Sequence, residues 1–424
     1  VSFANNDSTF NALTVSGGST SFGDGLTVAT DTGKFALNSS SITSVGALTL
    51  TGATGIDFGA GVAFTAGGDL SMSTSSGDLV GAGAFALTST GDISLSENLT
   101  TAGTTVITAD SDGNGAGDFS MGASTTLSAG NNSLTLTAND ISVSGSISSG
   151  TGSTTIAVSD GGTIGLGGTS GNMTIDGTEL SKMTAGTLNI GNSSTGNITV
   201  DGISAANSNN VSAVNLTAAN GSSVSFSNND STFNALTVSG GSTSFGSGLT
   251  VATDTGKFAL NSSSITSVGA LTLTGATGID FGAGVAFTAG GDLSMSTSSG
   301  DLVGAGAFAL TSTGDISLSE NLTTAGTTVI TADSDGNGAG DFSIGTSTTL
   351  SIGNNSLTLA ANDISISGSI NSGTGSTTIA VSDGGTIGFG GTSGNMTIDG
   401  TELSKITAGT LNIGNSSTGN ITVD

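Results

Sequence analysis

Residues 48–95 read LTLTGATGIDFGAGVAFTAGGDLSMSTSSGDLVGAGAFALTSTGDISL and contain three short units in which two apolar residues flank a polar one. These units are Leu48-Thr49-Leu50, Leu70-Ser71-Met72 and Ile93-Ser94-Leu95. Their first residues lie 22 and then 23 positions apart (70 − 48 and 93 − 70). Alternation with a period of two predicts a strand with one buried face. The Gly, Ser, Asn and Asp residues between the units predict turns.

The same unit recurs along the whole chain, most often about every 22 residues. Its first residues are Leu13, Leu48, Leu70, Ile93, Leu134, Ile156, Met173, Leu188, Val214 and Leu236. Helical periodicity is absent, and frequent Gly, Ser and Thr weaken helices. Short strands that recur most often about every 22 residues, separated by Gly, Asn, Asp and Ser turns, favour a parallel β-helix over hairpins. An antiparallel sandwich is the alternative, although it tolerates irregular spacing poorly.

Residues 224–424 repeat residues 1–201 at a constant offset of 223, with ten substitutions in the 201 aligned positions. Examples are Ala4/Ser227, Asp24/Ser247, Met121/Ile344, Val143/Ile366, Leu166/Phe389 and Met183/Ile406. Such a duplication predicts a stacked array, with copy 1 at 1–223 and copy 2 at 224–424 in one continuous rod. Ten or eleven coils fit one copy, which gives a rise of about 50 Å from the strand spacing. We expect the chain to be part of a longer array.

The composition excludes much chemistry. The chain has no Pro, Cys, His, Trp, Tyr or Arg, so it lacks the usual base near neutral pH, thiolate nucleophiles and zinc–sulfur sites. Its formal net charge of −27 opposes binding to nucleic acid and to anionic membranes. The sequence contains no run of 18 apolar residues, so it predicts no membrane-spanning helix. With 34% hydrophobic residues and a mean hydropathy of +0.23, an ordered Gly-turned β-structure fits better than disorder.

The phenylalanines are the largest apolar residues of the chain. We expect them to stack in the interior, with an external aromatic binding stripe as the alternative. In copy 1 they include Phe10, Phe22, Phe35, Phe58, Phe64, Phe85 and Phe119.

Residues 110–118, DSDGNGAGD, form the sharpest local motif. Oxygen-bearing side chains stand at positions 1, 3, 5 and 9 and Gly at position 6, as a calcium loop requires. The predicted ligands are Asp110, Asp112, Asn114 and Asp118, with Asp333, Asp335, Asn337 and Asp341 in copy 2. Met121 or Ile344 replaces the usual bidentate Glu, so a water or a remote carboxylate must complete the shell. The alternative is a solvated turn.

Glu179 and Lys182 lie in the least strand-like stretch at a spacing of three, and Glu402 and Lys405 repeat them. This spacing predicts a surface ion pair on one helical turn. With Leu180 and Met183 facing the coil, the turn would act as a small plug or bracket over the solenoid.

Enzymatic activity is not expected. Polysaccharide lyases and hydrolases occur among parallel β-helices, but they use Arg or Lys bases or paired carboxylates. Here Arg and His are absent and there are four Lys. Outward threonines such as Thr49, Thr135 and Thr199 could order water, as in ice-binding solenoids, but they are also ordinary exposed β-branched residues.

Residues 162–168, GTIGLGG, are followed at 178–191 by TELSKMTAGTLNIG, and both recur between 385 and 414. This wording, together with LTLTAND at 134–140, resembles the repeat regions of filamentous-haemagglutinin-like adhesins, which are large bacterial exoproteins secreted by the two-partner route. The resemblance implies a right-handed parallel β-helix, export and a surface or extracellular role. It carries over no ligand.

The sequence therefore predicts an all-β, non-enzymatic extracellular rod that serves as the stalk or spacer of a giant bacterial adhesin or surface fibre. The alternative is a segment of a self-associating extracellular filament or sheath. Expected partners are other copies of the chain, end to end or laterally, and other cell surfaces. No cofactor is required, and Ca²⁺ is the one ligand that a motif suggests.

Overall fold

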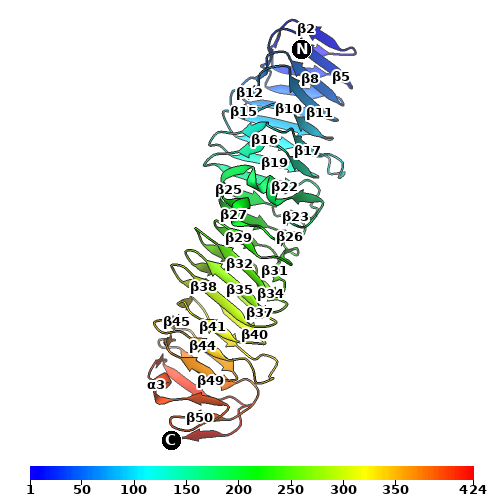
Figure 1. Ribbon diagram of the computed structural model, residues 1–424. Coiled ribbons are helices and arrows are strands. Elements are labelled where there is room, and N and C mark those ends of the chain that lie inside the picture. The colour runs from blue at the N-terminus through cyan, green and yellow to red at the C-terminus, as the bar shows by residue number, and fades with distance from the viewer. The chain divides into compact units, whose positions relative to one another are not determined.

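The computed structural model describes residues 1–424 and divides into two compact units, Val1–Ala219 and Asn220–Asp424. Half of the residues are in strands and 3% are in helices. In each unit short parallel strands stack as successive coils of a β-solenoid (Figure 1). The predicted parallel β-solenoid is therefore confirmed. The handedness inferred from the family resemblance stays a prediction.

Each regular coil of unit 1 contributes one strand to each of three faces. Face A contains β1 (Ser2–Phe3), β4 (Ser19–Phe22), β7 (Ser41–Ser44), β10 (Val62–Ala66), β13 (Phe85–Ser89), β16 (Thr105–Thr108), β19 (Leu134–Ala138), β22 (Ser153–Val158), β25 (Met183–Ile190) and β27 (Val211–Thr217). Face B contains β2 (Ser8–Phe10), β5 (Leu26–Thr30), β8 (Leu48–Gly52), β11 (Leu70–Thr74), β14 (Ile93–Leu95), β17 (Phe119–Met121) and β20 (Ile141–Val143). Face C contains β3 (Leu13–Val15), β6 (Phe35–Leu37), β9 (Ile56–Phe58), β12 (Leu79–Gly81), β15 (Leu99–Thr101), β18 (Thr126–Ser128) and β21 (Ser146–Ser148).

Unit 2 repeats the three faces. Its face A contains β28 (Ser223–Phe226), β31 (Ser242–Phe245), β34 (Ser264–Ser267), β37 (Val285–Ala289), β40 (Phe308–Ser312), β43 (Thr328–Thr331), β46 (Leu357–Ala361), β49 (Ser376–Val381) and β53 (Thr410–Ile413). Its face B contains β29 (Ser231–Phe233), β32 (Leu249–Thr253), β35 (Leu271–Gly275), β38 (Leu293–Thr297), β41 (Ile316–Leu318), β44 (Phe342–Ile344) and β47 (Ile364–Ile366). Its face C contains β30 (Leu236–Ser239), β33 (Phe258–Leu260), β36 (Ile279–Phe281), β39 (Leu302–Gly304), β42 (Leu322–Thr324), β45 (Thr349–Ser351), β48 (Ser369–Asn371) and β52 (Ile406–Thr407).

The coil count follows from face A, which has ten strands in unit 1 and nine in unit 2. Ten strands enclose nine turns and nine enclose eight, so the two units together contain about 17 turns. About nine turns per copy are close to, but fewer than, the predicted ten or eleven coils.

The regular coils end in an insertion in both units. In unit 1 it comprises β23 (Ile164–Gly167), β24 (Met173–Ile175), helix α1 (Gly177–Ser181), β26 (Ile198–Asp201) and helix α2 (Ala205–Ser208). In unit 2 it comprises β50 (Ile387–Phe389), β51 (Met396–Ile398), helix α3 (Gly400–Leu403) and β54 (Ile421–Val423). The long strand β25 pairs with both β21 and β22, so it joins faces A and C.

The core consists of like residues stacked in register from coil to coil. On face B, Leu48 pairs with Leu70, Leu70 with Ile93, and Ile93 with Phe119. All four side chains are at most 1% exposed. The alternation of buried and outward positions in β8 is the alternation seen in the sequence. Burial of these apolar side chains supplies much of the stability, at about 25 cal/mol per Å² of apolar area.

Most of the phenylalanines lie inside, as predicted. Phe22, Phe35, Phe58, Phe64, Phe85 and Phe119 are buried, whereas Phe10 is only partly buried. The rings of Phe58 and Phe85 lie 4.9 Å apart, centroid to centroid.

The corners between faces bring backbone very close to backbone. Gly77 has a φ of +117°, and a Cβ placed there would lie 2.4 Å from the carbonyl oxygen of Thr54 in the coil before it. Only Gly fits such a position, which explains part of the high Gly content. No buried side-chain nitrogen or oxygen lacks a hydrogen-bond partner.

Candidate functional site

Asp110, the first predicted calcium ligand, organises its own loop. The backbone of Asp110 has a φ of +53°, and its side chain is buried. The carboxylate accepts hydrogen bonds from the backbone N–H of Asn114 at 3.0 Å and of Gly115 at 3.1 Å. It also accepts one from the Ser159 hydroxyl, two coils further along, at 2.5 Å. The Asp110 carboxylate therefore links its own loop to the coil that lies two coils further along.

The remaining predicted ligands of unit 1 serve different partners. The side-chain amide of Asn114 donates to Asp112, and both residues are exposed. Asp118 turns to the next coil, where its carboxylate accepts from the Asn139 amide at 3.0 Å and the Asp140 N–H at 3.1 Å.

Unit 2 repeats this arrangement. Asp333 accepts from Asn337, Gly338 and Ser382, Asn337 donates to Asp335, and Asp341 accepts from Asn362 and Asp363. No group of three or more acidic side chains in the chain lies close enough to hold a metal ion. Calcium binding by the loop stays a prediction. It requires the first aspartate of each loop to exchange its backbone donors for the ion.

Asp118 belongs to a row of aspartates that the sequence analysis did not single out. We call Asp69, Asp92, Asp118 and Asp140 the carboxylate ladder of unit 1. Each lies directly before a face B strand, and each of the first three accepts a hydrogen bond from the N–H of the next, at 3.0, 2.8 and 3.1 Å. Asp140 accepts from Thr174 N–H at 2.8 Å. The ladder thus adds one charged hydrogen bond per coil at the corner.

The ladder of unit 2 comprises Asp292, Asp315, Asp341 and Asp363, with distances of 3.1, 2.9 and 3.0 Å. The signal was present in the sequence, because successive members lie 23, 26 and 22 residues apart, close to one coil. Asp before a strand is also an ordinary turn residue, so the spacing alone did not reveal the bonds.

A hollow of about 240 Å³ lies beside the ladder of unit 2. It is lined by three ladder aspartates and by the hydroxyls of Ser317, Ser343 and Ser365. Ser343 donates to Ser317 at 3.0 Å. The lining offers hydrogen-bond acceptors and negative charge, with no basic group among its residues. Such a surface attracts cations in a general way.

Glu179 and Lys182 both contact one residue of the edge strand β20. The Glu179 carboxylate accepts from the Val143 N–H at 2.8 Å, and the Lys182 ammonium donates to the Val143 carbonyl at 3.0 Å. The predicted surface ion pair between them is wrong. The ion pairs of the chain are Lys34–Asp57 and Lys257–Asp280. We call α1 with Glu179 and Lys182 the bracket of unit 1.

The local sequence builds the bracket. Asp176 caps α1 by accepting from the Glu179 N–H at 2.7 Å, and Glu179 reaches back to the Asp176 N–H at 3.1 Å. This capping box starts a helix of only five residues. Leu180 and Met183 are buried, so the turn is anchored in the core as the sequence predicted.

Burial raises the pKa of the Glu179 carboxyl above its ordinary value of 4.5. The hydrogen bonds from Val143 and Asp176 oppose this rise, and the charges of Asp176 and Asp140 add to it. The bracket therefore holds a carboxylate that is costly to keep charged.

Unit 2 has the same bracket, made of α3 with Glu402 and Lys405. Glu402 accepts from the Ile366 N–H at 3.1 Å, and Lys405 donates to the Ile366 carbonyl at 3.1 Å. Val143 and Ile366 were not identified from the sequence, because the contact spans 36 residues and depends on where β24 lies.

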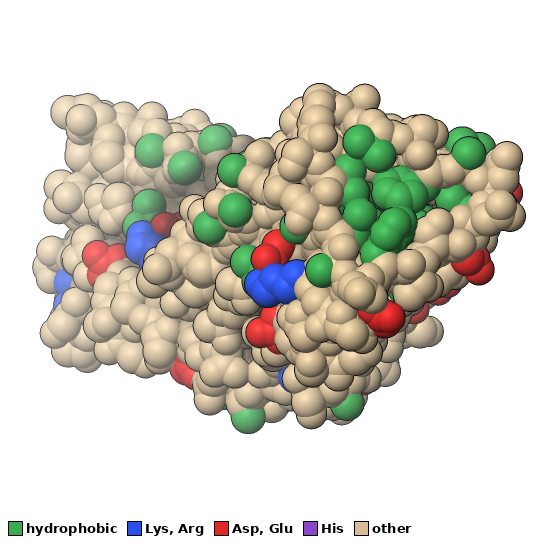
Figure 2. Space-filling view, turned by 90° about the horizontal axis from the view of Figure 1, so that it is seen from above, with side chains coloured by type: hydrophobic (Ala, Val, Ile, Leu, Met, Phe, Trp, Pro, Cys, Tyr) green, Lys and Arg blue, Asp and Glu red, His purple; other side chains and the backbone are tan.

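Charged side chains are sparse elsewhere. On the surface seen in Figure 2, acidic groups are scattered among uncharged ones and only a few Lys are visible. No helix of the chain is long and apolar enough to cross a membrane. No family model, curated protein or solved structure matches the chain.

Proposed function

We propose that the chain is a structural segment of a bacterial surface fibre, the repeat region that serves as stalk or spacer in a giant adhesin. It acts outside the cell, without catalysis and without nucleic acid as a partner. The stalk holds a binding module away from the surface that secretes it.

The observation that carries the proposal is the register of the stacked coils. In both units each coil repeats the preceding one at about 4.8 Å along the stack, so a copy of nine coils spans about 43 Å. A further copy adds length and reuses the same core, ladder and bracket. A protein selected for length gains from such repetition, whereas an enzyme needs one differentiated site.

Charge and sequence resemblance support the same role. A net charge of −27 keeps a long chain soluble and away from anionic polymers. The GTIGLGG and TELSKMTAGTLNIG segments resemble those of filamentous-haemagglutinin-like adhesins. That resemblance supports export to the bacterial surface.

The test is the length added by each copy. Chains with one, two and three 223-residue copies are prepared, and their maximum dimension is measured by small-angle X-ray scattering and their contour length by electron microscopy. The proposal predicts a constant increment of about 43 Å per copy. A maximum dimension that grows more slowly than the number of copies would contradict the stalk.

The second candidate is a filament or sheath in which chains associate with one another. The observation that favours it is that the strands of faces A and B carry no charged residue in either unit. In this reading other copies of the chain are the main partners.

A further inference from the structure

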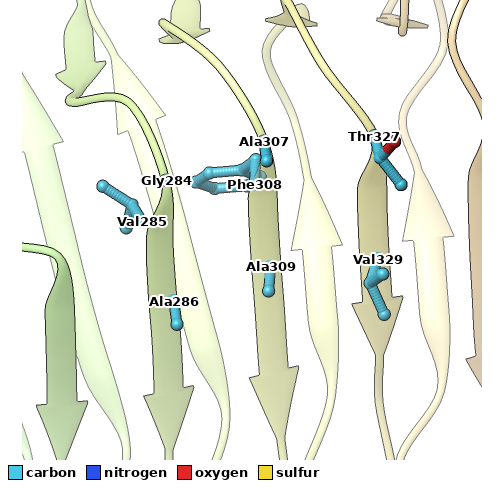
Figure 3. Close-up of a pocket in the computed structure, with 8 residues that line it drawn as sticks. All are labelled: Gly284, Val285, Ala286, Ala307, Phe308, Ala309, Thr327 and Val329. Atoms are coloured by element: carbon cyan, nitrogen blue, oxygen red, sulfur yellow. The ribbon is translucent and has the colours of Figure 1, made fainter.

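The turns of the chain hold a chemically reactive pair of residues that the strand faces lack. On face A of unit 2, for example, the outward side chains of Ala286, Ala309 and Val329 are apolar and unreactive (Figure 3). An Asn followed by Gly is different, because the next backbone nitrogen, which no Cβ shields, can attack the side-chain amide. The chain contains three such pairs, Asn114-Gly115, Asn220-Gly221 and Asn337-Gly338.

Exposure does not distinguish the three pairs, because all six residues lie on the surface. Hydrogen bonding does distinguish them. Gly115 donates its N–H to both carboxylate oxygens of the buried Asp110, at 3.2 and 3.1 Å, and Asn114 donates its own N–H to the same carboxylate at 3.0 Å. The side-chain amide of Asn114 donates to Asp112 at 3.0 Å. Carboxylates therefore hold both backbone nitrogens and the side-chain nitrogen of this pair.

The pair Asn337-Gly338 repeats this arrangement in unit 2. The Gly338 N–H donates to Asp333 at 3.1 and 3.3 Å. Asn337 donates its backbone N–H to Asp333 at 2.9 Å and its side-chain amide to Asp335 at 2.9 Å. Asp110 and Asp333 are each 1% exposed, and each also accepts a hydrogen bond from a serine of a later coil. The carboxylate of each loop is thus held from two sides.

The pair Asn220-Gly221 has none of these partners. No hydrogen bond holds the Asn220 side chain or the Gly221 N–H. Gly221 has a φ of +100°, and a Cβ placed there would meet no atom within 4 Å, so the turn is open on that side. The pair lies in residues 202–223, which separate the two aligned stretches of the repeat, and it directly precedes the first strand of unit 2.

We propose that Asn220 is a site of spontaneous deamidation, and that Asp110 and Asp333 protect the other two Asn-Gly pairs from this reaction. The proposal rests neither on the stalk nor on the filament, because it concerns the chemistry of single residues in one chain.

The reaction needs only water as a co-reactant. The Gly221 nitrogen attacks Cγ of Asn220, so the N–Cγ bond forms and the Cγ–Nδ2 bond breaks, and the proton of the Gly221 nitrogen leaves with Nδ2 as ammonia. Water then opens the succinimide that results. Cleavage of the new N–Cγ bond leaves an aspartate, whereas cleavage of the original peptide bond leaves an isoaspartate, whose main chain is one carbon longer. Either product adds a carboxylate directly before β28, and nothing is oxidised or reduced.

The loop carboxylate opposes the first step in two ways. Removal of the Gly115 proton would place a second negative charge beside the Asp110 carboxylate. The Gly115 nitrogen must also leave that carboxylate and turn towards Cγ of Asn114, which breaks charge-assisted hydrogen bonds. Bonds of this strength slow the reaction by more than about tenfold. Asn220 meets neither obstacle.

Peptide mapping of the whole wild-type chain tests the difference without any substitution. The protein is incubated in mildly alkaline water labelled with heavy oxygen, so that only amides converted during the incubation take up the label. It is then digested with pepsin in acid and analysed by mass spectrometry. Deamidation at Asn220 should be more than about tenfold faster than at Asn114 and Asn337. Peptides that extend to Met121 differ in mass from those that extend to Ile344, so the two loops are measured separately.

The variant Asp110→Ala tests the role of the carboxylate, with unit 2 as the internal reference. Deamidation at Asn114 should rise by more than about tenfold relative to Asn337 in the same molecules. The matched control is Ser159→Ala, which removes another hydrogen bond of Asp110 but leaves its bonds to the Asn114 and Gly115 N–H groups. This control should change the ratio far less.

Two results would overturn the proposal. One is equal deamidation of the three pairs in the wild type, which would mean that the hydrogen bonds do not control the reaction. The other is unchanged or slower conversion of Asn114 in Asp110→Ala, because a protecting carboxylate cannot be removed without faster conversion. Neither result affects the length increment per copy, so this proposal and the stalk can fail separately.

Discussion

The regular coils and the bracket satisfy the same backbone groups by different means. On face B the N–H and C=O groups of strands β2 to β17 meet those of the next strand. The row of paired strands on face B ends at β20. There Glu179 and Lys182 hydrogen-bond to the backbone of Val143 in place of a neighbouring strand. Unpaired strand edges invite unwanted pairing, so an interrupted sheet must cover its edge. The regular coils therefore depend on core packing, whereas the edge strand at which they are interrupted depends on charged side chains.

The largest expected effect is a cavity in the regular stack. Leu136 is fully buried on β19 and lies in register with Ile107 and Ile156. Leu136→Ala should destabilise its coil and the neighbours by about 2–5 kcal/mol, because the stack cannot collapse around the missing methyl groups. Coil contacts are local, so the effect should fade within a few coils.

Hydrogen exchange read by mass spectrometry measures this locally, and copy 2 is the internal reference. Peptides containing Thr137 differ in mass from their counterparts with Ala360, so the two copies can be told apart. Thr135→Ala, an outward change on the same strand, should alter exchange by less than about 0.5 kcal/mol. Equal effects of the two substitutions would show that the interior packing does not carry the stability.

The second effect tests the bracket. Lys182→Met keeps the apolar stem but leaves the Val143 carbonyl without its charged donor. Local stability around β20 should fall by about 1.5–3 kcal/mol. Lys34→Met is the matched control: Lys34 pairs with Asp57, but its side chain is 56% exposed, so its loss should cost at most about 1 kcal/mol. Exchange of peptides around Val143, distinguishable from those around Ile366, gives the first value. Peptides that contain position 34 of the Lys34→Met variant, which differ in mass from those with Lys257, give the control value. An effect of Lys182→Met no larger than that of Lys34→Met would refute the bracket.

The same residues show which parts of the fold could be predicted from the sequence. The period of the Leu48, Leu70 and Ile93 units was sufficient to predict parallel stacking, because each residue contacts its counterpart one coil away. The helical turn at Glu179 and Lys182 was also predicted, because the groups that start it, Asp176 and Glu179, are close in sequence.

The site residues were less predictable. Asp118 fitted a loop motif, yet its carboxylate bonds to Asp140 in the next coil. Glu179 matched Lys182 in spacing, yet both bind Val143, 36 and 39 residues earlier. A local sequence pattern identifies the polar residues but does not predict their hydrogen-bond partners. Those partners depend on which strand the insertion places beside them.

The third effect is a pH dependence within the bracket. The pKa of Glu179 is raised in the folded chain, so the folded state binds more protons than the unfolded state between the ordinary value of 4.5 and the raised one. Stability from this group is therefore present at low pH and is lost as pH rises through that window.

Glu179→Gln removes the titration while keeping an oxygen acceptor for Val143. The difference in local exchange stability between wild type and this variant should change across the window above pH 4.5, with the wild type losing ground as pH rises. Thr178→Ala, which removes no titrating group, should show a constant difference from wild type. A constant difference for Glu179→Gln as well would mean that burial of the carboxyl has no energetic consequence.

The smallest effect concerns the carboxylate ladder, where two contributions oppose each other. Asp92 accepts the Asp118 N–H, which stabilises the corner, but its charge stands in a row of like charges one coil apart. Asp92→Asn keeps the acceptor and removes the repulsion, so it should be neutral or stabilising by a few tenths of a kcal/mol at low salt. Asp92→Ala removes both and should cost about 1 kcal/mol.

Salt separates the two contributions of the ladder. At about 1 M NaCl the Debye length is about 3 Å, shorter than the coil spacing, so the advantage of Asn over Asp should disappear while the cost of Ala persists. An advantage of Asn that survives high salt would mean that its cause is not repulsion between coils. The ladder would then be a row of independent turn caps. In that case the regular coils, unlike the bracket, would owe nothing to the arrangement of their charges.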